Sequence, residues 1–253
     1  MVKNDLYLLG GIDENSSDCY GEDNDFSKIS LSQGTLCKNL QNMPDNKSDR
    51  GICHYRGEQI YSICGIILLE RFDTCERYNI AKNCWEILPN TSEKKHLVGC
   101  TPINNAIYIF GGKGKEGEVH TIEKLPIQGK VWQTIKIKIS PDLVDMSKCH
   151  PIYMGSDEVL IAGINHSGKT NCYIVNLKKA AVSATIKLGI EPVMHHLDSL
   201  NDIYLADNTN IVRINKNNKK LTKDRIANTT NKWKKRTFIY ELDESTIQDN
   251  EEY

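Results

Sequence analysis

The stretch Arg77–Pro89 reads R-Y-N-I-A-K-N-C-W-E-I-L-P, and it contains the clearest structural pattern in the chain. Tyr78 is followed seven positions later by Trp85, with the turn-forming segment N-I-A-K-N between them. Two β-prone runs joined by a short turn segment are typical of a β-hairpin. The stretch therefore predicts a strand, a tight turn and a second strand.

The same spacing recurs along the chain, because four more apolar residues are each followed by another seven positions later. The five pairs are Ile29 and Leu36, Tyr78 and Trp85, Leu125 and Trp132, Val175 and Val182, and Ile214 and Leu221. Each pair follows a β-prone apolar run, and the runs start at Leu6, Ile60, Ile107, Val159 and Ile203. These starts are 54, 47, 52 and 44 residues apart. The chain is therefore an array of repeats.

Each repeat has room for about four strands. A further apolar segment, such as G-I-C-H-Y at Gly51–Tyr55, precedes the apolar run in the complete repeats. That segment, the run and the hairpin together make four strands. Four strands at a period near fifty residues are typical of one blade of a β-propeller.

These features resemble the kelch repeat, in which an apolar run ends in Gly-Gly and is followed by Tyr, Trp and Met-Pro or Leu-Pro. The resemblance covers about residues 5–226 and is weaker in the last two repeats, where Gly163-Ile164 and Asp207-Asn208 replace the double glycine. It implies that the glycines end the second strand and that Tyr and Trp pack between blades. The structural marks are Gly10, Gly11, Met43-Pro44, Gly65, Tyr78, Trp85, Leu88-Pro89, Gly111, Gly112, Trp132 and Gly163.

The expected fold is an all-β, kelch-type β-propeller of about five blades, each with four antiparallel strands. The propeller is expected over residues 1–242, and residues 243–253 are expected to form an acidic disordered tail. The repeats are expected near residues 6–44, 50–90, 95–140, 148–190 and 193–228.

Closure of the ring is a separate prediction. Leu6 already begins the second strand of blade one, so that blade lacks a first strand. The run R-T-F-I-Y-E-L at 236–242 is β-prone, and we expect it to pair with Leu6–Gly10, because proteins avoid open strand edges. The alternative is a sixth blade supplied by an upstream segment.

One segment matches a nucleotide-binding motif. Residues 163–170, G-I-N-H-S-G-K-T, fit the phosphate-loop pattern G-x-x-x-x-G-K-[ST]. A true phosphate loop opens a helix, whereas N-C-Y-I-V-N-L after Thr170 is strand-like. Gly163 also falls on the first glycine position of the repeat. The repeat therefore predicts a surface hairpin here, and nucleotide binding is only a remote alternative.

Composition gives no support for other ligands. The formal charge is -1, and the basic stretch at 216–236 is interpreted as solvated rather than as a nucleic-acid site.

The nine cysteines include no C-x-x-C, and Met1 begins no signal peptide, so a cytoplasmic protein with reduced cysteines is expected. The longest apolar stretch, Ile63–Leu69, is too short to span a membrane. Neither Cys149-His150 nor His195-His196 has the paired spacing of a zinc site.

The kelch resemblance implies a protein-interaction module that binds a partner protein through its rim loops. Such modules serve as recognition or scaffold subunits, for example in ubiquitin ligases or cytoskeletal complexes. The alternative is a kelch-like enzyme of the oxidase or sugar-epimerase class, but no catalytic residues and no cofactor or metal ligands are predicted. The candidate partner-binding residues are Asp13, Glu14, Lys113, Lys115, His120, His166 and Lys169.

Overall fold

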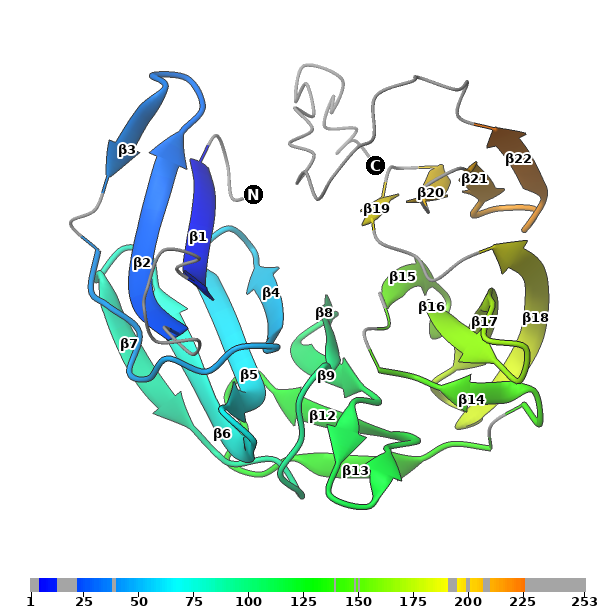
Figure 1. The fold of residues 1–253 in the computed structure, drawn as a ribbon, viewed down its shortest axis with the longest axis horizontal. Helices are drawn as coiled ribbons and strands as arrows, with labels where there is room; N and C mark the ends of the chain where they lie inside the picture. The colour runs from blue at the N-terminus through cyan, green and yellow to red at the C-terminus, as the bar shows by residue number, and fades with distance from the viewer. Residues whose placement is uncertain are drawn as a thin grey trace, which may run out of the picture.

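The computed structural model describes residues 5–12, 22–37, 40–138, 140–147, 149, 151–190, 195–198, 201–206 and 210–225. Within these ranges every regular element is a β-strand, and the strands form small antiparallel sheets arranged around a ring (Figure 1). The chain is therefore an all-β, five-bladed β-propeller, as its repeat predicts.

The first two blades differ in their number of described strands. Blade one is a three-stranded sheet of β1 (Asp5–Ile12), β2 (Glu22–Ser30) and β3 (Thr35–Cys37). Blade two is a four-stranded sheet of β4 (Gly51–Tyr55), β5 (Gln59–Ile67), β6 (Glu70–Asn79) and β7 (Cys84–Leu88). Blade one therefore begins at the second strand of its repeat, as expected from the position of Leu6.

The other three blades also follow the repeat. Blade three contains β8 (Gly99–Ile103), β9 (Ala106–Phe110), β12 (Thr121–Pro126) and β13 (Gln133–Lys136), with the small hairpin β10 (Lys113–Gly114) and β11 (Gly117–Glu118) inserted. Blade four contains β15 (Ile152–Gly155), β16 (Glu158–Asn165), β17 (Thr170–Asn176) and β18 (Ala181–Ile190), with β14 (Leu143–Asp145) added beside β16. Blade five contains β19 (His195–Asp198), β20 (Asp202–Ala206), β21 (Asn210–Asn215) and β22 (Leu221–Arg225). The strands β1, β4, β8, β15 and β19 lie nearest the middle of the ring (Figure 1).

Antiparallel pairing explains the seven-residue spacing in the sequence. Ile29 faces Leu36, Tyr78 faces Trp85, Val175 faces Val182, and Ile214 faces Leu221, each across the last hairpin of a blade. The register of β12 and β13, in which Lys124 faces Gln133, would place Leu125 opposite Trp132. Facing apolar residues share one side of the sheet and pack together. The predicted hairpins are therefore confirmed.

The double glycine occupies a position where the backbone is left-handed. Gly10, Cys64 and Gly111 end the apolar run of their blades with φ values of 59°, 58° and 60°. Glycine adopts this conformation without a steric cost, whereas the Cβ of Cys64 makes it less favourable. The following glycine has a packing reason, because a Cβ on Gly112 would lie 2.6 Å from Val98 Cγ1.

Blade four departs from this arrangement at Gly163. Strand β16 continues through Gly163 in regular register with β17, whereas β1 and β5 run past the same position with a register shift at Gly11 and at Gly65. A Cβ on Gly163 would nevertheless lie 2.5 Å from Leu143 Cδ1. The prediction that the glycines end the second strand is therefore confirmed in blade three, where β9 ends at Phe110, and is wrong for Gly10-Gly11, Gly65 and Gly163. Close packing against β14 explains why glycine occupies position 163.

The hydrophobic core is divided into layers between consecutive blades. Four clusters of buried side chains lie between blades one and two, two and three, three and four, and four and five. Trp132 is 7% exposed in the second of these layers, and its indole N–H donates to the carbonyl of Pro89 at 2.9 Å. Trp132 is therefore a packing residue between blades, as predicted.

Trp85 also packs between blades, as the resemblance implies, but it is only half-buried. Its ring lies 5.3 Å from that of Phe26 on β2 and 5.2 Å from that of Tyr78. Its indole N–H donates to the carbonyl of Gln41 at 3.0 Å at an exposed position. Blade one therefore covers one side of Trp85 and leaves the outer side accessible to solvent.

The described residues do not test how the ring closes. Strand β1 pairs with β2 along one edge, and no strand among the described residues pairs with its other edge. The run 236–242, which we expect at that edge, lies outside the described residues, as do residues 243–253 and Asp207-Asn208. Closure by 236–242 stays a prediction.

Candidate functional site

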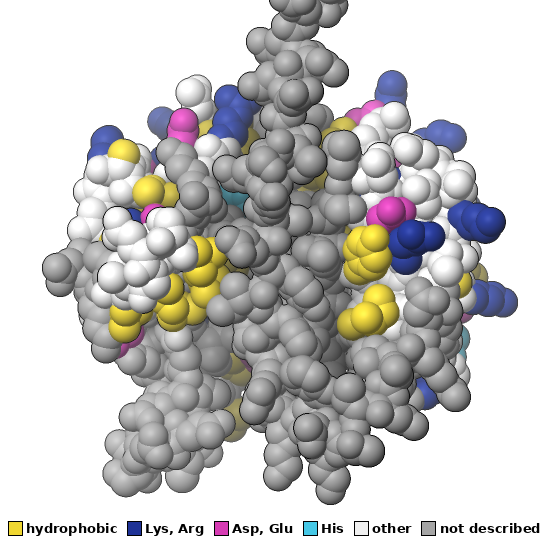
Figure 2. All heavy atoms as spheres, turned by 90° about the horizontal axis from the view of Figure 1, so that it is seen from above, with side chains coloured by type: hydrophobic (Ala, Val, Ile, Leu, Met, Phe, Trp, Pro, Cys, Tyr) yellow, Lys and Arg dark blue, Asp and Glu magenta, His cyan; other side chains and the backbone are white. Residues whose placement is uncertain are grey.

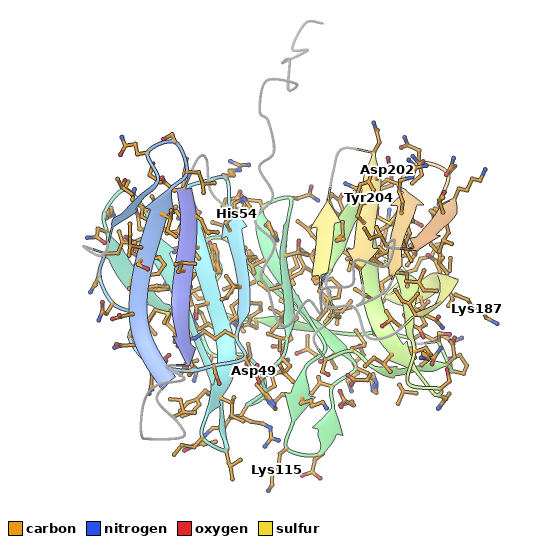
Figure 3. The ribbon with its side chains drawn as sticks, turned by 45° about the horizontal axis from the view of Figure 1, so that its top comes forward. Asp49, His54, Lys115, Lys187, Asp202 and Tyr204 are labelled. Atoms are coloured by element: carbon orange, nitrogen blue, oxygen red, sulfur yellow. The ribbon has the colours of Figure 1, made fainter. Side chains whose placement is uncertain are left out.

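Two kinds of connection meet at one end of the ring. Strands alternate in direction within an antiparallel blade, so the connection from second to third strand and the connection to the next blade leave at the same end. Backbone bridges join the two kinds of connection, since Ser48 pairs with Ile66 and His96 pairs with Lys113. We call this end the hairpin rim, and it contains the hairpin connections 67–70, 111–120 and 165–170. Asp49 and Lys115 lie at this end, whereas His54 lies at the opposite end (Figure 3).

The candidate residues from the sequence gather at the hairpin rim. Lys113 and Lys115 lie on the β10–β11 hairpin, and His120 lies just after it. His166 and Lys169 lie in the β16–β17 connection. Topology therefore brings these loops together, although they are far apart in sequence. Asp13 and Glu14 lie outside the described residues.

Both candidate histidines anchor their hairpins. The Nε2 atom of His120 lies 3.0 Å from the carbonyl of Val144, and that of His166 lies 3.0 Å from the carbonyl of Pro141. Both carbonyls belong to the connection from blade three to blade four. These imidazoles therefore have a structural role in holding the rim together, while the side chain of Lys115 is exposed.

The segment that matches a phosphate loop is a β-hairpin. Thr170 begins strand β17 and pairs with Ile164, so no helix opens at this point. The side chain of Asn165 accepts hydrogen bonds from the backbone N–H groups of Ser167 and Lys169, at 2.9 and 3.1 Å. Because these amides are already bound within the turn, they do not form the cradle that a phosphate requires. The geometry is that of the hairpin predicted by the repeat.

A pair of carboxyl groups lies between blades three and four at the rim. Glu118 Oε1 lies 3.1 Å from Lys113 Nζ, while its Oε2 is buried without a hydrogen-bond partner among the described residues, and the Asp145 carboxyl group interacts with it electrostatically. Burial first, and then this interaction with Asp145, raise the pKa of Glu118 to about 7. Burial would raise the pKa of Asp145 as well, but its interaction with Glu118 and hydrogen bonds from Ser147 lower it. Glu118 therefore keeps its proton to a higher pH than Asp145 does.

An apolar tip projects from the rim in blade two. Leu68 and Leu69 form the turn between β5 and β6, and they are 55% and 88% exposed. Leu68 has a φ of 54°, a conformation that glycine or asparagine adopts more readily. Beside the tip, Lys94 Nζ lies 3.2 Å from Glu70 Oε1 and 5.8 Å from the centre of the Phe72 ring. These two adjacent exposed leucines, of which Leu68 is in a conformation that leucine rarely adopts, form a candidate contact surface.

Sequence reasoning missed this tip, although a signal for it was present. The signal is the longest apolar stretch of the chain, Ile63–Leu69, which is too short to span a membrane. Strand β5 ends at Ile67, so the last two residues of the stretch lie beyond the end of the strand. In the part of the chain that the structure describes, no helix has the length and apolar character needed to cross a membrane.

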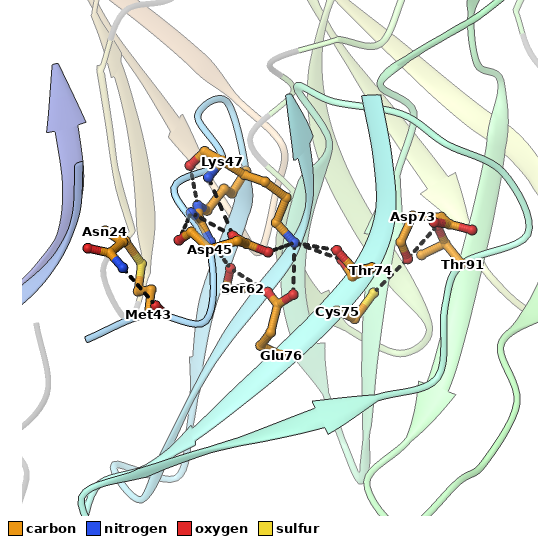
Figure 4. Close-up of polar contacts among 11 residues, drawn as sticks. Asn24, Met43, Asp45, Lys47, Ser62, Asp73, Thr74, Cys75, Glu76 and Thr91 are labelled. Carbon is orange, nitrogen blue, oxygen red and sulfur yellow. Dashed lines mark hydrogen bonds and ion pairs between the residues drawn. The ribbon is translucent and has the colours of Figure 1, made fainter. Parts of the chain in front are cut away.

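Two buried ion pairs, also missed, support the blades that carry this rim. Lys47 Nζ lies 2.8 Å from Glu76 Oε1 in blade two (Figure 4), and Lys95 pairs with Glu123 in blade three. Each lysine lies four residues before the glycine that begins the inner strand, and each glutamate lies two residues before the first member of the seven-residue pair. The pairs therefore tie the incoming connection of a blade to its third strand. Their repetition indicates a structural role.

The remaining candidate chemistry is limited in the described residues. No three His, Cys, Asp or Glu side chains among them come close enough to hold a metal ion. Cys149 is buried, and burial raises the pKa of its thiol to about 12. His150 and the side chains of His195 and His196 lie outside the described part.

Fold and rim together define the chain as a five-bladed β-propeller with an exposed apolar tip among its rim hairpins. No family model matches the chain, and no match is found among curated proteins.

Proposed function

We propose that the chain is a kelch-type protein-interaction module that binds a partner protein through its hairpin rim. The observation that carries the proposal is the exposure of the adjacent Leu68 and Leu69 in a turn where Leu68 has a left-handed backbone that leucine rarely adopts. Exposed apolar side chains at such a position lower solubility and add strain, so a bound partner would explain their presence. The role is binding rather than catalysis.

The composition of the rim favours a protein as its ligand. Protein interfaces combine an apolar centre with a polar edge. At the hairpin rim, Leu68 and Leu69 supply the apolar centre, and the exposed Glu70–Lys94 pair supplies a polar edge. Lys115 adds a further charge on the neighbouring blade. The expected partner has an apolar surface that receives the two leucines and polar groups around it.

The kelch assignment rests on the repeated marks and what they do in the structure. The left-handed position that recurs at Gly10, Cys64 and Gly111, and the burial of Trp132 between two blades, support the assignment. We propose a cytoplasmic role as a recognition or scaffold subunit of a larger complex, such as a ubiquitin ligase or a cytoskeletal assembly. The identity of the bound partner decides between these assemblies.

The test is a pair of matched variants in an affinity capture from cell extract. The double variant Leu68→Gly/Leu69→Asn removes the apolar tip and places a glycine at the left-handed position, so folding is preserved. The control is Val131→Asn, because Val131 is 70% exposed in the β12–β13 connection at the opposite end of the ring.

A captured protein is then purified and its Kd measured by calorimetry. We expect the wild type and Val131→Asn to bind it alike, and the double variant to bind at least about tenfold more weakly, since the two leucines lose their contacts. A partner that binds the double variant as tightly as the wild type, or that is lost in Val131→Asn, would contradict the proposed rim.

A further inference from the structure

Two cysteines of neighbouring blades lie in contact at the inner strands. Cys53 is on β4 of blade two, Cys100 is on β8 of blade three, and their Sγ atoms are 2.9 Å apart. Both are free thiols, and both are half-buried. The thiol of Cys100 donates a hydrogen bond to the sulfur of Cys53. This contact joins two blades and is not part of the repeat, since the two residues occupy different positions in it.

The close approach of the two strands follows from Gly51. A Cβ on Gly51 would lie 2.5 Å from Val98 Cγ2 and 3.3 Å from Cys100 Cβ, so a larger residue would push β8 away. At the other end of β4, the hydroxyl of Tyr55 donates to Asn105 Oδ1 at 2.8 Å. These contacts hold the strands in place on both sides of Cys53. The sulfur contact is therefore built into the interface between the blades.

The surroundings distinguish this pair from the other described cysteines. Cys64, Cys75, Cys149 and Cys172 are buried and shielded from solutes. Cys84 is half-buried like the pair, but it lies on β7 and faces Asn79. Within the described residues, Cys53 and Cys100 thus combine partial exposure with a second thiol in contact. Oxidation requires the first property, and disulfide formation requires the second.

We propose that Cys53 and Cys100 form a peroxide-reactive dithiol that closes to a disulfide between blades two and three. The sulfur of Cys53 attacks one oxygen of hydrogen peroxide, the O–O bond breaks, and the products are a Cys53 sulfenic acid and one water. The sulfur of Cys100 then attacks the Cys53 sulfur, the S–O bond breaks, and the released hydroxide takes the Cys100 proton to form the second water. Two thiols lose two electrons, and the peroxide gains them.

The order in which the two cysteines react follows from their surroundings. Burial, and then the hydrogen bond to Cys53, raise the pKa of Cys100 well above its ordinary value. Cys100 therefore keeps its proton until the second step, while Cys53 accepts the hydrogen bond and reacts first. A small dithiol such as dithiothreitol reverses the reaction by thiol–disulfide exchange.

Mass spectrometry of the full chain tests the proposal directly. The folded protein is treated with hydrogen peroxide, free thiols are alkylated, and the protein is digested with trypsin without reduction. Cleavage after lysine and arginine places Cys53 in peptide 51–56 and Cys100 in peptide 96–113, each with one cysteine. We expect most of the protein to carry these two peptides linked at a peroxide dose that leaves Cys84, in peptide 83–94, mostly alkylated. Dithiothreitol should release the link.

Variants and melting provide a second readout. Cys53→Ser and Cys100→Ser should each abolish the link, whereas Cys84→Ser should leave it unchanged. Oxidation should raise Tm by about 5 °C or more in the wild type and not in Cys53→Ser, because a disulfide restricts the unfolded chain. The proposal is overturned if the wild-type digest lacks the 51–56 to 96–113 link, if Cys84 oxidises as readily as Cys53, or if Cys64 and Cys75 link instead.

Discussion

Single residues in equivalent places of the repeat have different surroundings in this propeller. Trp132 is enclosed between blades two and three, while Trp85 leans on Phe26 and Tyr78 and remains half-exposed. The same residue type at the same repeat position therefore contributes different amounts to stability, because its burial depends on the neighbouring blade.

The first prediction concerns these two tryptophans. Trp132→Ala should lower the free energy of unfolding by about 3–5 kcal/mol, because it leaves a cavity in the layer between two blades. Trp85→Ala should cost less, roughly 1–3 kcal/mol, since its outer side is already in solvent. Urea denaturation of both variants measures the difference. An equal or larger cost at Trp85 would contradict the assigned packing.

The second prediction concerns the pH dependence of stability at Glu118. The pKa of Glu118 is about 7 in the folded chain, against an ordinary value of 4.5. Between these values the unfolded chain releases the proton and the folded chain keeps it, so this group makes stability fall as the pH rises from 4.5 to 7. Glu118→Gln removes the ionisation.

The measurement compares the free energies of unfolding of wild type and Glu118→Gln at pH 5 and pH 8. From pH 5 to pH 8, the free energy of unfolding of Glu118→Gln relative to that of the wild type should rise by roughly 1–3 kcal/mol. This range allows for solvent screening of a partly exposed group. Lys113→Met is the control, since without Lys113 the ionised form of Glu118 loses its cation and the fall should become steeper. A pH-independent difference would show that Glu118 ionises normally.

At the scale of strands and hairpins, a buried ion pair holds the incoming connection to its blade in blades two and three. The side chains of Lys95 and Glu123 are 1% and 0% exposed, and Glu123 Oε2 also accepts from the backbone N–H of Ser92 at 2.9 Å. A buried charge without its partner is costly, whereas a buried pair contributes little net stability. The pair therefore fixes the position of the connection more than it stabilises the fold.

The third prediction tests this pair. Lys95→Met should cost about 3–5 kcal/mol, because it leaves the Glu123 carboxylate buried without its cation. Lys95→Met combined with Glu123→Gln should recover part of that loss, since Gln keeps an acceptor for Ser92 and carries no charge. Lys94→Met, which removes an exposed lysine paired with Glu70, should stay within about 0.5 kcal/mol of wild type in the same urea titration. A double variant less stable than Lys95→Met would contradict the argument.

At the scale of the whole molecule, closure of the ring depends on what covers the free edge of blade one. Figure 2 looks onto the side where blades one and five lie, and it shows hydrophobic side chains on both. The exposed large hydrophobic residues of these blades include Leu8, Leu36 and Ile211. An open strand edge beside such residues would favour aggregation. The predicted closing strand, 236–242, would cover it.

The fourth prediction tests closure with two truncations. Deleting residues 236–253 removes the predicted strand and the tail, and the shortened chain should melt at a lower temperature or aggregate through β1. Deleting residues 243–253 removes the tail alone and should leave Tm within a degree or two of the full chain. Differential scanning calorimetry and light scattering provide the readouts. Equal melting of both truncations and the full chain would show that the closing strand is wrong.

The sequence alone was sufficient for the fold because its pattern is local. In the last hairpin of each blade, facing residues such as Tyr78 and Trp85 are seven positions apart, so the pairing of strands appears directly as a spacing. The positions of Lys113, Lys115, His166 and Lys169 in hairpin loops follow from the same register. The end of the second strand did not follow, because β1, β5 and β16 run past the glycine position, whereas β9 ends before it.

Contacts between blades were decided by the tertiary structure alone. Cys53 contacts Cys100, and Asp145 acts on the pKa of Glu118, each across an interface between two blades. The distance between the blades at these interfaces depends on glycines and loops of both blades. The exposure of Leu68 and Leu69 also depends on where β5 ends, and an apolar run by itself does not show that. Pairing inside a hairpin is set by neighbours in the chain, whereas contacts between sheets are set by packing of residues far apart in sequence. The first leaves a periodic trace in the sequence, and the second does not.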